Sequence, residues 1–372
     1  MIIGVPKEIK EFEYRVGVLP SGVRVLKKHG HTILIQRGAG EGCRVTDEEF
    51  RSAGATIVDG NAEIYGEAEM IMKVKELQEE ECELIRPNQL LYAYLHLAPA
   101  PRLTEVLLQR EVIAIAYETI QLDDGSLPLL IPMSEVAGRM AVQVGAHFLE
   151  KTQGGRGVLL GGVPGVSRGR VTIIGAGTVG RAAAKIAVGI EAEVHILDVD
   201  QARLAYMDDL FGNRVTTLMS NHDNVSASVI NSHLVIGSVL IPGARAPKLV
   251  DRDMIKNMAA GTVVVDVAID QGGCFETSRP TTHQHPTFVV DDVIHYCVAN
   301  MPGAVARTST HALTNVTLPY ALKLADEGFE KAVLQDRTLA RGINLYKGRV
   351  THEKVAQALG YSYTSLDSVV NI

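Results

Sequence analysis

A glycine-rich turn between a short apolar run and a helical segment most constrains the fold of this chain. Residues 171–174 (VTII) are apolar and mostly β-branched, Gly175-Ala176-Gly177-Thr178-Val179-Gly180 follows, and residues 181–188 have helical character. In such a unit the first glycine makes a tight turn, the second lets the backbone approach a pyrophosphate, and the third lets helix and strand pack closely. The helix N-terminus favours an anion. The pattern therefore predicts a dinucleotide-binding unit.

A carboxylate after the next strand sharpens this prediction. Residues 193–197 form a second strand candidate that ends in Asp198, where a carboxylate can accept hydrogen bonds from both ribose hydroxyls of an adenosine. Asp198 and Asp200 would also repel a 2′-phosphate, so we expect NAD rather than NADP. The alternative, a turn of glycines beside an unrelated surface aspartate, is disfavoured because strand, loop, helix and acid occur in order.

Two series of strand candidates alternate with helical segments. The second series supplies six strands, the number in a complete dinucleotide-binding sheet, at residues 171–174, 193–197, 214–218, 234–236, 262–265 and 295–298. The first series has short buried runs at residues 2–5, 32–35, 55–58, 70–74, 90–95 and 112–116. Between them we expect helices, one capped by Ser21 and ending at Gly30, another opened by the capping box at Thr46. Strand–helix alternation predicts parallel sheets.

The remaining segments suggest how the two sheets are connected. Residues 134–152 are predicted to form a connecting helix, and the glycine-rich stretch 154–165 a loop. After Pro302 the pattern is helical at residues 304–315 and 319–326, and in a Thr351-capped segment that ends at Gly360. We predict an α/β fold of two doubly wound, Rossmann-like parallel-sheet domains, with the NAD domain inserted into a discontinuous substrate domain. The boundaries are 1–128 and 306–372 for the substrate domain, whose C-terminal part consists of helices, and 129–305 for the NAD domain.

Charge and cysteine spacing exclude several classes of protein. The 372 residues include 36 Lys and Arg against 43 Asp and Glu, a formal net charge of −7, which argues against a nucleic-acid partner. The four cysteines show no metal-binding or disulfide spacing, so we expect no metal. Without a signal segment or an apolar run long enough for a membrane span, the sequence predicts a soluble, cytoplasmic protein.

Four polar side chains follow strand candidates, at the edge where open α/β sheets bind ligands. Lys75 ends Lys73-Val74-Lys75, His96 follows residues 90–95, Arg15 follows the first strand, and Asp270 follows residues 262–265. Arg15 could clamp a carboxylate, and a histidine can transfer protons near neutral pH. From spacing alone a solvated strand end is the favoured interpretation of the two lysines, and a structural role is the favoured interpretation of His96. The acidic run 79–83 is expected to be a solvated helix start without chemistry.

Seven motifs together resemble the L-alanine dehydrogenase family. They are PKE with EYRV near the N-terminus, KVKE at 73–76, YLHLA at 94–98, PMSEVAGRMA at 132–141, GAGTVG at 175–180, DVAIDQGG at 266–273 and NMPGAVARTST at 300–310. The resemblance begins at the first residues, keeps the order of the motifs and extends beyond residue 320. One departure is Leu77, where the family often has a proline after KVKE.

The resemblance implies a function and a set of site residues. Members oxidise L-alanine with NAD and water to pyruvate, ammonium and NADH, run the reverse amination, and are usually homo-hexamers. By position, Arg15 and Lys75 match the residues that hold the substrate, and His96 and Asp270 match the catalytic pair. The implied cofactor contacts are the glycine loop (Gly175, Gly177, Thr178, Val179, Gly180) with Ser134, Asp198, Arg203, Ser220, Val239, Leu240, Val267, Ala268, Ile269, Asp270, Arg279, Val298, Asn300 and Met301.

Three other functions remain as alternatives. An NAD(H)-binding subunit like that of proton-translocating transhydrogenase shares the PKE opening and both sheets, but typically carries a glutamate where this chain has Asp270. A related dehydrogenase of a larger amino acid, such as a saccharopine-forming type, is a second alternative. A non-catalytic NAD-sensing module is the third, and it would not need Arg15, Lys75 and His96 together.

Overall fold

The computed structural model describes residues 1–239 and 246–370, and the chain divides into two compact units. Unit 1 comprises Met1–Met133 and Gly303–Ile372, and unit 2 comprises Ser134–Pro302. Unit 2 is thus inserted into the sequence of unit 1. The boundaries expected from the sequence, after residues 128 and 305, lie a few residues away. The expected boundaries remain a prediction of where each autonomously folding part begins and ends.

Unit 1 is built on an eight-stranded sheet in the order β15-β14-β6-β5-β4-β1-β2-β3. Its first six strands pair with one another in parallel, and β14 and β15 extend the β6 edge in antiparallel pairing. The strands are β1 (Ile2–Val5), β2 (Thr32–Gln36), β3 (Thr56–Val58), β4 (Met70–Met72), β5 (Leu90–Ala93), β6 (Ile113–Ala116), β14 (Ile343–Tyr346) and β15 (Arg349–Val350).

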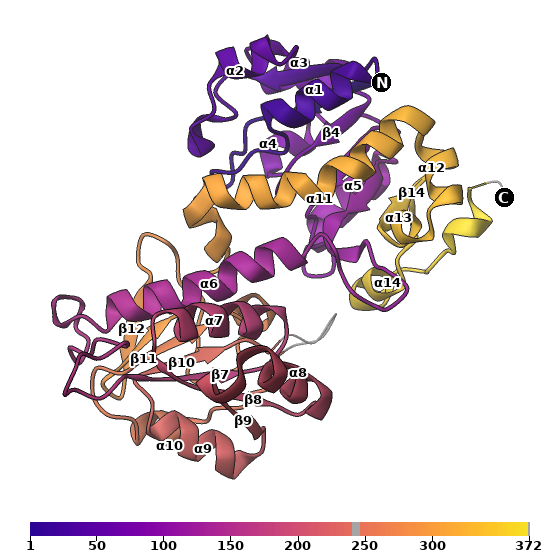
Figure 1. The fold of residues 1–372 in the computed structure, drawn as a ribbon. Helices are drawn as coiled ribbons and strands as arrows, with labels where there is room; N and C mark the ends of the chain where they lie inside the picture. Colours follow the sequence, from indigo (N-terminus) through magenta and orange to yellow (C-terminus); the bar gives the residue numbers. More distant parts are fainter. Residues whose placement is uncertain (240–245, 371–372) are drawn as a thin grey trace. The chain divides into compact units, whose positions relative to one another are not determined.

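Helices cover both faces of this sheet because its strands are apolar on both sides. Along β5, Leu91 and Ala93 belong to an apolar cluster with α3, α5 and α14, whereas the Tyr92 hydroxyl donates to the carbonyl of Thr317 in α11. The helices of unit 1 are α1 (Pro20–Lys28), α2 (Asp47–Ser52), α3 (Asn61–Glu67), α4 (Glu79–Cys82), α5 (Pro101–Gln109), α11 (Ala306–Glu327), α12 (Phe329–Gln335), α13 (Arg337–Arg341) and α14 (Glu353–Leu359). Figure 1 shows the long α11 in orange among the indigo and magenta elements of the N-terminal half.

The C-terminal part of unit 1 departs from the predicted run of helices. Residues 343–350 form the hairpin β14–β15, and β14 pairs with β6, so this segment completes the sheet. A single α11 runs through Pro319, where a break was expected, and Thr351 donates to the carbonyl of Ile343 instead of capping α14. Ser21 is not a cap either, since α1 begins at Pro20. The predicted capping box at Thr46 is confirmed.

Unit 2 is built on a seven-stranded sheet in the order β12-β13-β11-β10-β7-β8-β9. Six strands are parallel in the doubly wound order, and the antiparallel β12, absent from the sequence prediction, extends the β13 edge. The strands are β7 (Arg170–Ile174), β8 (Glu193–Asp198), β9 (Val215–Met219), β10 (Leu234–Gly237), β11 (Val263–Asp266), β12 (Thr287–Val290) and β13 (Val293–Tyr296).

The helices of unit 2 lie on both faces of its sheet (Figure 1). They are α6 (Ile131–Phe148), whose first turn belongs to unit 1, α7 (Thr178–Gly189), α8 (Gln201–Phe211), α9 (His222–Ile230) and α10 (Arg252–Lys256). The expected connecting helix is therefore present as α6. It packs tightly on α7, because a Cβ on Gly138 would lie 2.2 Å from the carbonyl oxygen of Val179. None of the helices in the described residues is long and apolar enough to cross a membrane.

Candidate active site

The glycine loop of unit 2 has the shape that the sequence predicts. Gly175 has φ of +106°, a left-handed conformation that favours glycine, and a Cβ on Gly180 would lie 1.8 Å from the Gly175 carbonyl oxygen. Among the described residues no heavy atom lies within 4 Å of a Cβ placed on Gly177, the N-cap of α7. The first turn of α7 (Thr178, Val179), whose amides have no acceptor within the helix, thus begins beside open space, as an anion site requires.

Asp198 ends β8 beside this loop and is 6% exposed. Its two oxygens accept hydrogen bonds from the Ala176 amide at 2.6 Å and the Asp200 amide at 2.9 Å. Asp200, expected only to repel a phosphate, caps α8 by accepting from the Ala202 amide. The exposed Arg203 guanidinium lies 3.8 Å from Asp198 and 3.5 Å from Asp200. The aspartate thus ties β8 to the glycine loop.

The carboxyl ends of neighbouring parallel strands bring several more predicted contacts to the same edge. Gly237 at the end of β10 pairs in register with Ile174 of β7 and Asp266 of β11, so the segments that follow these strands are neighbours. The residues placed after strands are Ser220, Val239, Val267, Ala268, Ile269 and Val298. The sequence did not single out Ser238, whose hydroxyl lies 2.9 Å from the carbonyl oxygens of Ile174 and Gly175.

The other predicted contacts lie on further elements of unit 2. Ser134 is in α6, Asn300 has φ of +59° and its carbonyl oxygen is 3.2 Å from His283, and Met301 is buried in the turn that follows. The Arg279 guanidinium stacks on the Phe288 ring at 4.4 Å. Leu240 lies outside the described residues. These residues fit a dinucleotide, because Gly177 leaves open space at a helix N-terminus beside a buried carboxylate.

The loop after β11 carries Asp270 on a short 3-10 turn, Ile269–Gln271, with its side chain exposed. Gly272 and Gly273 follow with φ of +91° and +74°. Inside the loop lies Asp266, which is fully buried. Asp266 was not among the predicted site residues.

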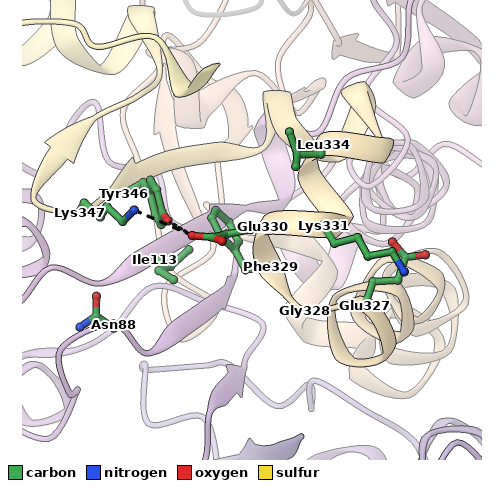
Figure 2. Close-up of a pocket in the computed structure, with 10 residues that line it drawn as sticks. All are labelled: Asn88, Ile113, Glu327, Gly328, Phe329, Glu330, Lys331, Leu334, Tyr346 and Lys347. Carbon is green, nitrogen blue, oxygen red and sulfur yellow. Dashed lines mark hydrogen bonds and ion pairs between the residues drawn. The ribbon is translucent and has the colours of Figure 1, made fainter. Parts of the chain in front are cut away.

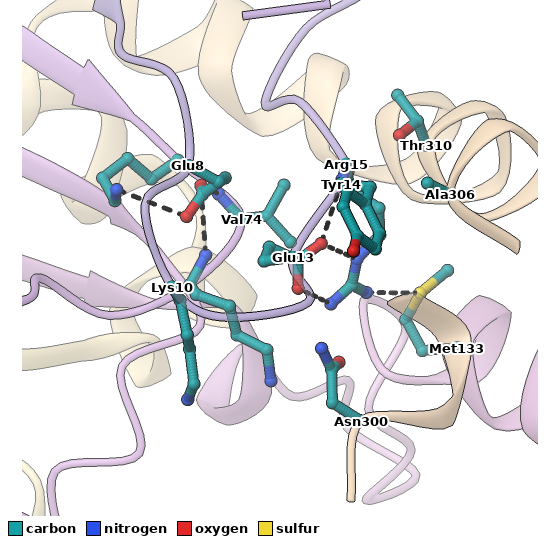
Figure 3. A network of polar contacts seen from close by, with 12 residues as sticks. Glu8, Lys10, Glu13, Tyr14, Arg15, Val74, Met133, Asn300, Ala306 and Thr310 are labelled. Carbon is teal, nitrogen blue, oxygen red and sulfur yellow. Dashed lines mark hydrogen bonds and ion pairs between the residues drawn. The ribbon is translucent and has the colours of Figure 1, made fainter. Parts of the chain in front are cut away.

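Arg15 of unit 1 is held by its neighbour Glu13 (Figure 3). The two Glu13 oxygens accept from Nε and Nη2 of Arg15, both at 2.6 Å, and Nη1 contacts the sulfur of Met133 at 3.1 Å. Arg15 is 2% exposed. Burial disfavours its cation, but the Glu13 carboxylate outweighs this and raises the pKa of Arg15. The structure thus supplies a buried, permanently charged guanidinium whose orientation is fixed by an adjacent acid.

Lys75 follows β4 and differs sharply from Lys73. Burial lowers the pKa of Lys75, and the nearby positive charge of Arg15 lowers it further. Lys73 is fully buried in ion pairs with Glu81 at 2.5 Å and Glu8 at 3.3 Å. Lys73 therefore has a structural role. The expectation that residues 79–83 are solvated is wrong for Glu81, which is buried by this pair.

His96 follows β5 and has φ of +48°, which is uncommon for a residue other than glycine. Its amide donates to Glu118 at 2.6 Å, and the amide of Leu95 donates to both oxygens of the same carboxylate at 3.2 Å. The His96 Nδ1 atom lies 4.0 Å from Glu118, and the ring stacks on Tyr94 at 6.0 Å. Glu118 thus holds the backbone of His96 in a strained conformation.

Arg15, Lys75 and His96 follow β1, β4 and β5, which are neighbours in one parallel sheet, and Arg15 is close enough to Lys75 to lower its pKa. Sequence reasoning missed the acids that hold them, which are Glu13 for Arg15, Glu118 for His96, and Glu8, which accepts from the amides of Val74 and Lys75 at 2.6 and 3.3 Å. Two of these acids lie within the quoted motifs, Glu8 in PKE and Glu13 in EYRV, but neither received a role, and Glu118 lies in no motif.

A hollow of about 670 Å³ lies elsewhere in unit 1 and contains none of the predicted site residues. Phe329, Lys331, Tyr346 and Lys347 line it, and the Tyr346 hydroxyl bonds to Glu330 at 3.0 Å (Figure 2). Among the described residues no group of three or more histidine, cysteine or acidic side chains is arranged to hold a metal ion.

Two family models match nearly the whole chain. The alanine dehydrogenase/PNT N-terminal domain matches residues 4–137, and the alanine dehydrogenase/PNT C-terminal domain matches residues 141–353. The chain belongs to the alanine dehydrogenase/PNT family. Among its relatives in this family, the alanine dehydrogenase of Methanococcus maripaludis is 56% identical over 372 residues and that of Halomonas elongata 54% identical over 370 residues. Both alignments cover 100% of each chain.

Two solved structures agree with the fold. An L-alanine dehydrogenase structure superposes with a TM-score of 0.94 at 51% identity and covers 97% of this chain and 99% of its own. A transhydrogenase from Sinorhizobium meliloti superposes with a TM-score of 0.81 at 23% identity and covers 95% of this chain and 99% of its own, which shows a shared fold. The predicted fold class and the predicted family are therefore confirmed.

Proposed function

We propose that this protein is an NAD-dependent L-alanine dehydrogenase. The reaction is L-alanine + NAD⁺ + H₂O to pyruvate + NH₄⁺ + NADH + H⁺, and it is reversible. The observation that carries the proposal is the cluster of Arg15, Lys75 and His96 after neighbouring strands of unit 1, in a chain whose unit 2 has a dinucleotide cradle. The relatives named alanine dehydrogenase support it along the full length of the chain.

The residues of the cluster suit the steps of this reaction. NAD, when bound, accepts the hydride from Cα of alanine. Arg15 and Lys75 bind the substrate carboxylate and polarise the oxygen that becomes the pyruvate carbonyl. His96 accepts a proton from the water that attacks the imine and returns one to the departing ammonia. These roles require a charged Arg15, which Glu13 ensures, and a histidine with an accessible ring, which the 46% exposure of the His96 side chain allows.

Three finer points belong to the same proposal. Asp198 accepts the ribose hydroxyls, so NAD is preferred over NADP. Asp270 assists proton transfer or holds the water and ammonia. By family resemblance the protein is a cytoplasmic homo-hexamer, which light scattering of the purified protein would test.

An absorbance assay of NADH tests the proposal directly. We expect NADH formation that depends on L-alanine at alkaline pH, and NADH oxidation that depends on both pyruvate and ammonium. A panel of larger amino acids tests for a different substrate in the same reaction class. NADH binding without turnover on any amino acid would contradict the proposal and favour the transhydrogenase-like subunit.

Variants of the cluster test the assigned roles. Lys75→Ala and His96→Ala should abolish turnover because they remove the substrate cation and the proton carrier. Both variants should keep NADH affinity, since the cradle is built by unit 2. Titration of NADH fluorescence provides that control, and near wild-type turnover in either variant would refute its role.

A further inference from the structure

Asp266 lies at the start of the loop that carries Asp270, and its carboxylate bonds to the far side of the same loop. The side chain is fully buried at the end of β11. One oxygen accepts from the Ala268 amide at 3.1 Å, before Asp270, and the other from the Cys274 amide at 2.9 Å, after it. One carboxylate therefore joins both limbs of the loop.

Further contacts strengthen this arrangement. The second oxygen also lies 2.6 Å from the Ser278 hydroxyl and 3.4 Å from the Phe275 amide, both donors, and the Cys274 thiol donates to the first oxygen at 3.7 Å. Burial raises the pKa of Asp266 above its ordinary value, while hydrogen bonds from Ser278 and the backbone oppose that rise. Such a buried acid is costly unless donors surround it, as they do here.

The loop sequence is adapted to this carboxylate. Glycine is required at position 273 for two reasons. A Cβ there would lie 2.4 Å from an Asp266 oxygen, and the φ of +74° is a conformation that favours glycine. The 3-10 turn that presents Asp270 ends at Gln271, and its C-cap Gly272 directly precedes this contact. The Val267 amide, by contrast, donates to the Gly237 carbonyl at 2.9 Å and is held by the sheet itself.

We propose that Asp266 is a positioning residue, which holds the loop between Val267 and Cys274 in the shape that presents Asp270 to the reaction. This inference rests on the proposed function, in which Asp270 takes part in the chemistry. It separates two tasks within one loop. The start of the loop is fixed by the sheet and is available for the nucleotide, and the Asp270 turn is fixed by the Asp266 carboxylate.

The first test is Asp266→Asn in the full-length protein. The amide keeps the volume of the side chain but presents a donor to one of the donor groups of the loop. We expect kcat to fall about 100-fold, as for a misplaced reacting group, while the Kd for NADH, to which this loop supplies only part of the predicted contacts, rises by a much smaller factor. Hydrogen exchange at the amides of Ala268, Cys274 and Phe275 should become faster. Near wild-type kcat, or unchanged exchange, would overturn the proposal.

A double-mutant cycle tests whether Asp266 acts through Asp270. If it does, Asp266→Asn should cause little further loss of kcat in an Asp270→Asn background, because residues that act as one unit are not additive. Additive losses would overturn the proposal. Full turnover by Asp270→Asn alone would instead refute the role of Asp270 in the proposed function, and the present inference with it.

Two further variants complete the design. Ser278→Ala removes one donor and keeps the carboxylate, so it should lower kcat in the same direction by a smaller factor. Ser278→Ala also keeps the proposal testable if Asp266→Asn does not fold. An unchanged kcat in Ser278→Ala would then contradict the proposal. Asp292→Asn, at an exposed turn with φ of +61°, is the matched control and should change neither kcat nor exchange in the loop.

Discussion

At the scale of single residues, the groups proposed for chemistry in unit 1 are each held by a neighbouring acid. Glu13 occupies one edge of the Arg15 guanidinium, and Glu118 accepts from the His96 amide. The motifs identified Arg15 and His96, and EYRV contains Glu13 without indicating its role. Glu118 was missed, because a carboxylate that accepts from a distant backbone amide has no spacing signature in the sequence. Lys73 illustrates the converse. Its position resembled that of Lys75, and only the folded chain shows that Glu8 and Glu81 enclose it.

Glu118 offers a prediction about the strained conformation of His96. Glu118→Ala removes the acceptor for the His96 amide, so the backbone should relax from its positive φ and kcat should fall by up to about 100-fold. Glu118→Gln keeps an acceptor oxygen and should recover much of this loss. Asp123→Asn, a change at an exposed carboxylate on the surface, is the control. Steady-state kinetics measure both variants, and equal losses in Ala and Gln would refute a backbone role.

Lys75 offers a prediction about pH. Its folded pKa is lowered from the ordinary value of 10.5, so its charge is lost at lower pH than in an exposed lysine. The affinity of the enzyme–NADH complex for pyruvate, measured without ammonium, should therefore weaken as pH rises through the lowered pKa. Because folding disfavours the charged form, the same rise in pH should increase stability. Lys75→Ala should bind pyruvate weakly with no such step. A step that persists in this variant would assign it to another group.

At the scale of elements, the glycine loop offers a position where a substitution should weaken nucleotide binding without lowering the stability of the fold. A Cβ added to either Gly177 or Gly189 would meet open space. Only Gly177 belongs to the glycine loop, because Gly189 lies at the other end of α7. Gly177→Ala should thus leave the melting temperature nearly unchanged while NADH affinity falls at least tenfold, because the methyl group blocks close approach of the pyrophosphate. Gly189→Ala should retain affinity. Calorimetry and fluorescence titration measure the two effects, and a stable Gly177→Ala variant with normal affinity would refute the assignment.

The elements also show what the sequence could predict. Short apolar runs identified the parallel strands, because a strand that is buried on both faces of a sheet is apolar throughout. The helical spacing of apolar residues identified α6. The hairpin β14–β15 was missed because residues 343–346 form a short run whose strand character depends on pairing with β6, far away in the chain. Pro319 was expected to break a helix, but tertiary packing, including the contact of Thr317 with Tyr92, keeps α11 continuous.

At the scale of the whole molecule, the division into two units predicts unequal fragments. Residues 134–302 contain a complete sheet with helices on both faces, so this fragment should fold alone and bind NADH. Residues 1–133 lack α11 and β14, which cover and extend their sheet, and should not fold cooperatively without them. Circular dichroism during thermal melting distinguishes the two outcomes. A cooperative transition in the 1–133 fragment, or its absence in the 134–302 fragment, would contradict this division.

The pairing of β14 with β6 has a consequence for synthesis on the ribosome. The first six strands of unit 1 emerge early, yet the strand that pairs with the outer edge of β6 is translated only after all of unit 2. At about 5–20 residues per second, the roughly 230 intervening residues take some 10–50 seconds. During that interval the β6 edge is an unpaired template for other nascent chains. Vectorial synthesis therefore makes the N-terminal part of unit 1 the segment with the greatest need of chaperone protection.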